Sequence, residues 1–135
     1  MSNLSESTLM IQSRPILPEP NTPRIRLFLD TADTTHWQNW LPTGLFYGVT
    51  TNPLLLEKAQ VTCSLEQLKD LARQAFNLGA KEVQLQTWGT SVDALVKTGE
   101  LLAAISDRIV VKVPITKDGT QAASQLIAQG IRITL

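Results

Sequence analysis

Apolar and polar residues follow two different periods along this chain, and the two periods separate strands from helices. Dense runs of branched aliphatic residues, such as IVVKV at 109–113, are typical of strands buried on both faces of a sheet. Apolar residues spaced three and four apart predict amphipathic helices, and the clearest example lies between the capping-box pattern SLEQ at 64–67 and Gly79. Strands are predicted at 25–29, 46–50, 82–86, 109–114 and from 131 onward. Helices are predicted near 34–41, from 53, at 64–79, at 91–105 and at 120–128. Because strands and helices alternate without hairpin turn signals, the pattern predicts an α/β fold with a parallel sheet.

Residues 1–23 differ from the rest of the chain because they show no clear period and are rich in Ser, Pro and Asn. Proline cannot donate a backbone hydrogen bond, so four prolines between positions 15 and 23 disfavour a regular helix or a central strand. The prediction is a flexible N-terminal arm at 1–23, with a short docked strand as the alternative, followed by one α/β domain at 24–135.

Charge and composition exclude several classes of partner. Lys plus Arg and Asp plus Glu both number 12, so the formal net charge is zero and no basic field favours nucleic acid or an anionic membrane. Cys63 is the single cysteine, so an intramolecular disulfide is impossible and a reducing compartment fits. The chain has neither an apolar stretch of about 20 residues nor a secretory start. The expectation is a cytoplasmic protein with no nucleic-acid or membrane partner.

Lys112 is the most informative residue, because it interrupts the apolar run at 109–115. Lysine is almost never fully buried without a partner, and a lysine that loses its water favours the neutral amine that attacks carbonyls. Asp30, Asn52 and Gln86 also stand at or near the ends of predicted strands. Parallel strands end at one edge of the sheet, where α/β enzymes place their active sites. The four residues are therefore predicted to meet there.

Such a set suits Schiff-base chemistry, in which an amine attacks a ketone and the iminium then withdraws electrons from a neighbouring carbon–carbon bond. Asp30 would bind hydroxyls or move protons, and the amides of Gln86 and Asn52 would orient a hydroxyl or a water. No metal cluster or glycine-rich phosphate loop is present in the sequence, so no cofactor is expected. Simpler roles remain open. Lys112 can extend to solvent, Asp30 and Asn52 can cap helices, and Gln86 can be merely solvated.

Several segments resemble the transaldolase family. They are LFLDTAD at 27–33, GVTTNPLLL at 48–56, Gln86, and IVVKVPIT at 109–116. The resemblance is closest to the small branch, which contains fructose-6-phosphate aldolase and the short bacterial transaldolases. It covers about residues 25–135, which is everything except the arm.

This resemblance implies a (β/α)8 TIM barrel, of which the chain supplies about the first five βα units. It implies that Lys112 forms the Schiff base with a ketose donor and that Asp30 contacts donor hydroxyls and assists proton transfer. Asn52 and Thr51 correspond to the pair that lines the donor pocket, and Gln86 corresponds to the residue that holds the catalytic water. The implied partners are a sugar-phosphate substrate and, as a homo-oligomer, further copies of the chain.

The departure from the family is the number of strands. Eight are needed for the barrel, and the chain stops before the threonine that follows strand 5 and before the later tyrosine, arginine and serine of the site. The expected function is transfer of a dihydroxyacetone unit between sugar phosphates, or reversible cleavage of fructose 6-phosphate, toward which Gln86 tilts the expectation. The alternative is a truncated, non-catalytic half-barrel that acts as an oligomeric or partner-binding protein.

Overall fold

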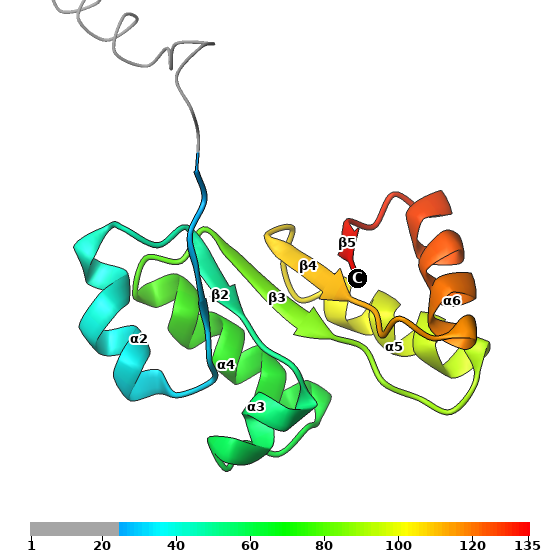
Figure 1. Cartoon of the computed structure of the whole chain (residues 1–135), viewed down its shortest axis with the longest axis horizontal. Helices are drawn as coiled ribbons and strands as arrows, with labels where there is room; N and C mark the ends of the chain where they lie inside the picture. The colour runs from blue at the N-terminus through cyan, green and yellow to red at the C-terminus, as the bar shows by residue number, and fades with distance from the viewer. Residues whose placement is uncertain (1–24) are drawn as a thin grey trace, which may run out of the picture.

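A single parallel sheet organises the computed structural model, which describes residues 25–135. Its five strands lie in chain order β1-β2-β3-β4-β5, and each pairs in parallel with the next. The strands are β1 (Phe28–Asp30), β2 (Gly48–Thr50), β3 (Glu82–Gln86), β4 (Ile109–Lys112) and β5 (Ile133–Thr134). Figure 1 shows the colour passing from blue to red across the sheet, as this order requires. All five strands therefore point the same way, and their carboxyl ends share one edge.

Helices fill the connections between successive strands. They are α2 (Thr34–Trp40), the 3-10 turn η1 (Leu41–Thr43), α3 (Pro53–Lys58), α4 (Leu65–Asn77), α5 (Val92–Ala103) and α6 (Lys117–Ala128). Each α-helix begins at a side chain that accepts a hydrogen bond from the first turn: Asp33, Asn52, Ser64, Ser91 and Thr116. These caps satisfy backbone N–H groups that would otherwise lack a partner.

The core lies between the helices and one face of the sheet. Val49, Val83, Leu85 and Val111 point to this face and are fully buried. They pack in one hydrophobic cluster with helical residues: Trp37, Leu68, Leu71, Leu95, Leu102 and Leu126. Because side chains alternate along a strand, the residues between them point to the opposite face, where most of the polar strand residues gather.

The predicted α/β class and parallel sheet are confirmed, and the boundaries of several elements are corrected. The first strand begins at Phe28 rather than at 25, because Ile25 is 79% exposed and pairing with β2 covers only Phe28–Asp30. Strands 2, 4 and 5 are also shorter than predicted. Helix α6 begins earlier, at Lys117, because Thr116 caps it. Gly119 in its first turn hid that start, and a Cβ there would lie 1.8 Å from the carbonyl oxygen of Pro114.

Burial on both faces of β4 was predicted, and it holds only for part of the strand. Ile109, Val110 and Val111 are buried, whereas Lys112 is half-buried. The strand ends at that residue, so its long side chain leaves the apolar layer. The anomaly that the sequence suggested, a charge enclosed in the core, is therefore resolved by the position of Lys112 at the edge of the sheet.

The predicted arm at 1–23 lies outside the residues that the structure describes. In the part that is described, no helix combines the length and the apolar character needed to cross a membrane.

Candidate functional site at the carboxyl edge of the sheet

The structure brings three of the predicted site residues to one edge. Asp30, Gln86 and Lys112 are the last residues of β1, β3 and β4. Gln86 pairs in register with Lys112, so the two lie side by side on the same face. Asp30 pairs with Thr50, which in turn pairs with Gln84. Two adjacent rows of polar residues thus cross the face of the sheet that lies opposite the hydrophobic core.

Lys112 occupies the upper of these rows, between Gln86 on β3 and Thr134 on β5. Ion pairs among residues 25–135 join His36 to Asp33, Arg73 to Asp70 and Arg132 to Glu82, so the Lys112 side chain takes part in none of them. Lys112 is thus a half-buried amine without an acidic partner among the described residues, and it is flanked by a carboxamide and a hydroxyl.

Asp30 is held by a short hydrogen bond. The Thr50 hydroxyl donates to its Oδ1 at 2.6 Å, which leaves Oδ2 available for another donor. The alternative role as a helix cap belongs instead to Asp33, whose side chain accepts from the Thr35 backbone N–H at 2.9 Å. Asp30 is therefore an exposed carboxylate at a strand end, oriented across the sheet by its neighbour on β2.

Asn52 uses its side-chain oxygen to cap a helix and leaves its amide nitrogen without a partner among the described residues. Its Oδ1 accepts from the Leu55 backbone N–H at 2.9 Å and caps α3, as the simpler interpretation predicted. The amide nitrogen remains a donor for a ligand. Thr51 is placed differently: it is 1% exposed and its hydroxyl donates to the Gln84 carbonyl at 3.0 Å. The structure does not bring the Thr51 side chain to the row of Lys112; Thr50 lies on that face instead.

A charged network lies beneath these rows. Glu82, which is 6% exposed, is the one buried carboxylate of the described chain. Its Oε1 accepts from the Gln84 Nε2 at 3.0 Å, and its Oε2 accepts from Arg132 at 3.3 Å. Arg132 also donates to the Asp107 carbonyl at 3.0 Å. Since Glu82 is on β3 and Arg132 precedes β5, the pair spans β4 on the side from which Lys112 projects.

Sequence reasoning missed this network. Strand alternation places Glu82, Gln84 and Gln86 on one face, so the period of two carried a signal for the β3 residues. No comparable signal existed for Arg132, because 50 positions separate it from Glu82 and only the sheet order brings them together.

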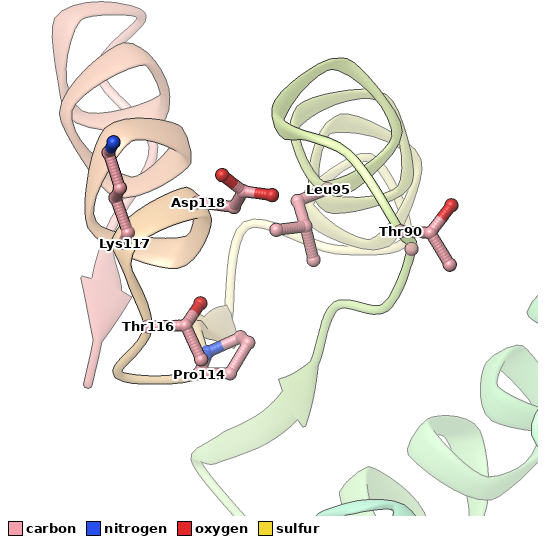
Figure 2. A pocket seen from close by; sticks show the side chains of 7 residues that line it. Thr90, Leu95, Pro114, Thr116, Lys117 and Asp118 are labelled. Carbon is pink, nitrogen blue, oxygen red and sulfur yellow. The ribbon is translucent and has the colours of Figure 1, made fainter.

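A cleft of about 430 Å³ opens just beyond the ends of β3 and β4, between the starts of α5 and α6. Figure 2 shows Asp118 of α6 directed toward Leu95 of α5, with Lys117 extending along its own helix. Thr116 and Lys117 line this cleft as the cap and the first residue of α6. None of the predicted site residues lines it. The polar rows therefore form an open face rather than a closed pocket.

Metal ligands do not gather on this face. Among residues 25–135 no group of three or more His, Cys, Asp or Glu side chains is arranged to hold a metal ion. The chemistry that the face itself offers comes from an amine, a carboxylate, carboxamides and hydroxyls.

In βα-barrel enzymes the active site lies at the carboxyl edge of a parallel sheet, and this is the edge at which Asp30 and Lys112 end their strands. Residues 27–135 match the family described as Transaldolase/Fructose-6-phosphate aldolase. The chain belongs to this family.

Individual relatives agree with the family match. The chain is 34% identical over 108 residues to a "Probable transaldolase" of Phenylobacterium zucineum, covering 80% of this chain and 48% of the relative. Similar relatives with the same name occur in Herpetosiphon aurantiacus, at 33% over 108 residues, and in Aquifex aeolicus, at 30% over 107 residues. They cover 80% and 79% of this chain, and 47% of each relative. The chain thus spans about half the length of the curated relatives it matches.

Proposed function

We propose that the polar face performs Schiff-base chemistry on a ketose phosphate. The side-chain nitrogen of Lys112 attacks the ketone carbon, a water molecule leaves, and an iminium joins the donor to the protein. The iminium accepts the electron pair of the adjacent carbon–carbon bond, so the bond breaks and a three-carbon dihydroxyacetone unit stays attached. The observation that carries the proposal is the side-by-side placement of Lys112 and Gln86 at the edge of the sheet in a transaldolase-family chain.

The neighbouring residues would divide the remaining work. Asp30 would take and return the proton of a donor hydroxyl through the oxygen that Thr50 leaves available. Gln86 would hold the water that enters or leaves at the iminium carbon, because a carboxamide can both donate and accept. Asn52 would donate its amide N–H to a donor hydroxyl while its oxygen caps α3. Thr51 would act indirectly, by fixing the end of β2 against β3.

Two outcomes of this chemistry are proposed, transfer of the three-carbon unit to an acceptor sugar phosphate and its release as dihydroxyacetone. Gln86 favours release, since a carboxamide does not act as the acid or base that a carboxylate would be at this position. Assay of dihydroxyacetone from fructose 6-phosphate without an acceptor distinguishes them, because only release produces it.

A second candidate function rests on the open edges of the sheet. Within the described residues β1 and β5 each pair on one side only. Unpaired edges bind further strands, which favours a homo-oligomeric or partner-binding role. In this candidate the face would be covered by another chain and would perform no chemistry.

Borohydride trapping tests the catalytic proposal directly. Incubation with fructose 6-phosphate and sodium borohydride should reduce the iminium to a stable secondary amine on Lys112, identified by peptide mass spectrometry. Lys112→Ala should abolish the adduct, whereas Lys117→Ala, an exposed lysine on the nearby rim, should leave it intact. A folded chain that forms no adduct on Lys112 would refute the proposal and leave the binding role.

A further inference from the structure

The side-chain amide of Gln84 has a defined orientation. Both oxygens of Glu82 act as acceptors, one from Gln84 and one from Arg132. The group of Gln84 that faces Glu82 must therefore be its donor, the nitrogen, at 3.0 Å. The amide oxygen of Gln84 lies at the other end of the planar group, so it points away from the carboxylate.

The row that Gln84 occupies is shared with a residue of the proposed site. Asp30 pairs with Thr50, and Thr50 pairs with Gln84, so the three stand at one level of the sheet. Their side chains project from the face that carries Lys112 one level above. Gln84 is half-buried rather than covered, and no hydrogen bond among the described residues occupies its oxygen. Only Thr50 separates Asp30 from Gln84 in this row, so a ligand bound by Asp30 can extend to Gln84.

The geometry points to Gln84 as a specificity-determining residue that accepts a hydrogen bond from a hydroxyl of the ketose donor. Glu82 is then a positioning residue, which acts by keeping the Gln84 oxygen turned toward the ligand. This inference rests on the proposed function, because it assigns a role at the face where Lys112 forms the iminium. Hydroxylated ketones should be preferred over plain ketones for this reason.

The substitution Glu82→Gln tests whether Glu82 orients the Gln84 amide or only stabilises the fold. In Glu82→Gln the new side chain must give its oxygen to Arg132, since Arg132 can only donate. Its nitrogen then faces Gln84, whose amide must turn over to present an acceptor. The Gln84 nitrogen would point to the ligand instead of its oxygen. Glu82→Gln should therefore convert an acceptor into a donor without changing the size of either side chain.

The test measures hydroxyl preference by borohydride trapping on Lys112, with dihydroxyacetone and acetone as the two ketones. The quantity is the ratio of their half-saturating concentrations. Loss of one hydrogen bond between neutral groups should shrink the preference for dihydroxyacetone about fivefold in Gln84→Met. The trapping rate at saturating ketone should change less than about twofold, since the amine is untouched. Gln125→Met, at an exposed position of α6, is the matched control and should leave the ratio unchanged.

The double variant decides whether Glu82 acts through Gln84. Glu82→Gln alone should reduce the hydroxyl preference, and it should add nothing when Gln84→Met is already present. Circular dichroism of every variant establishes that the fold is intact. Gln84→Asn serves as a second variant, because it retains an amide on a side chain that is one methylene group shorter.

The failures are distinguishable. Adducts with an unchanged ratio in Gln84→Met would overturn the role of Gln84 and leave the proposed function intact. Additive losses in the double variant would overturn the positioning role of Glu82. No adduct on Lys112 with either ketone would overturn the proposed function and this inference with it.

Discussion

Arg132→Met tests whether the network beneath Lys112 holds the sheet together. The substitution keeps an apolar stem but removes the guanidinium that donates to Glu82 at 3.3 Å and to the Asp107 carbonyl at 3.0 Å. The Glu82 side chain is 8% exposed, so its carboxylate cannot recover full hydration once the partner is gone. A hydrogen bond to a charged group contributes about 1.5–3 kcal/mol, and the low end applies because Arg132 is 53% exposed. We expect the free energy of unfolding to fall by about 1.5 kcal/mol.

A matched control exists on the surface. Arg73 forms an ion pair with Asp70, with side chains 68% and 47% exposed, so Arg73→Met should lower the free energy of unfolding by less than about 0.5 kcal/mol. Urea unfolding followed by tryptophan fluorescence gives both values, with the slope checked for a constant change in exposed surface. Equal losses in the two variants would refute the argument, because burial of Glu82 would then add nothing to the pair.

Three further predictions concern packing and reactivity. Gly48→Ala should lower the free energy of unfolding by more than about 2 kcal/mol in the same urea assay, because its Cβ would lie 2.0 Å from the backbone oxygen of Glu82, which cannot move without disturbing the sheet; a tolerated alanine would contradict the close approach of β2 and β3. Leu126→Ala should lower it by about 2–5 kcal/mol, since Leu126 is fully buried, while Ile127→Ala, at a residue 57% exposed, should lower it by less than about 0.5 kcal/mol. Partial burial raises the pKa of the Cys63 thiol, so less thiolate is present at neutral pH and iodoacetamide should react more slowly with the folded chain than with the urea-unfolded chain. The ratio of the folded to the unfolded reaction rate, measured by mass spectrometry, should rise as the pH rises. A faster reaction of the folded chain at neutral pH would argue against this reasoning.

Local signals were strong where the period of the sequence matched the burial of the chain. The apolar stripe of α4 and the run of β4 are examples, because one face of each packs on the core. Boundaries were weaker where backbone contacts decided them. Helix α6 starts three residues before its prediction because Thr116 caps it, and Gly119 is required there by the close approach of Pro114. Such contacts depend on how the segment between β4 and α6 packs against the first turn of α6, which the amino-acid composition does not predict.

The candidate site divides in the same way. The placement of Lys112, Asp30 and Gln86 at one edge of the sheet could be predicted, since parallel strands end at the same edge whatever the details of packing. It could not be predicted that Thr50, rather than Thr51, lies on the polar face. A difference of one position decides which face of β2 a side chain occupies, and the register is set by pairing with β1 and β3.

The amino-acid sequence by itself determined the α/β class, the parallel sheet, the helix caps at Asn52 and Ser64, and the presence of an amine, a carboxylate and carboxamides at strand ends. Periodicity and strand direction suffice for these features because both are local properties of the chain. Only the tertiary structure decided that Glu82 pairs with Arg132 across β4 and that the Gln84 amide is turned by this pair. These interactions join residues on separate strands, so they depend on the order and register of the sheet, which no local pattern in the sequence encodes.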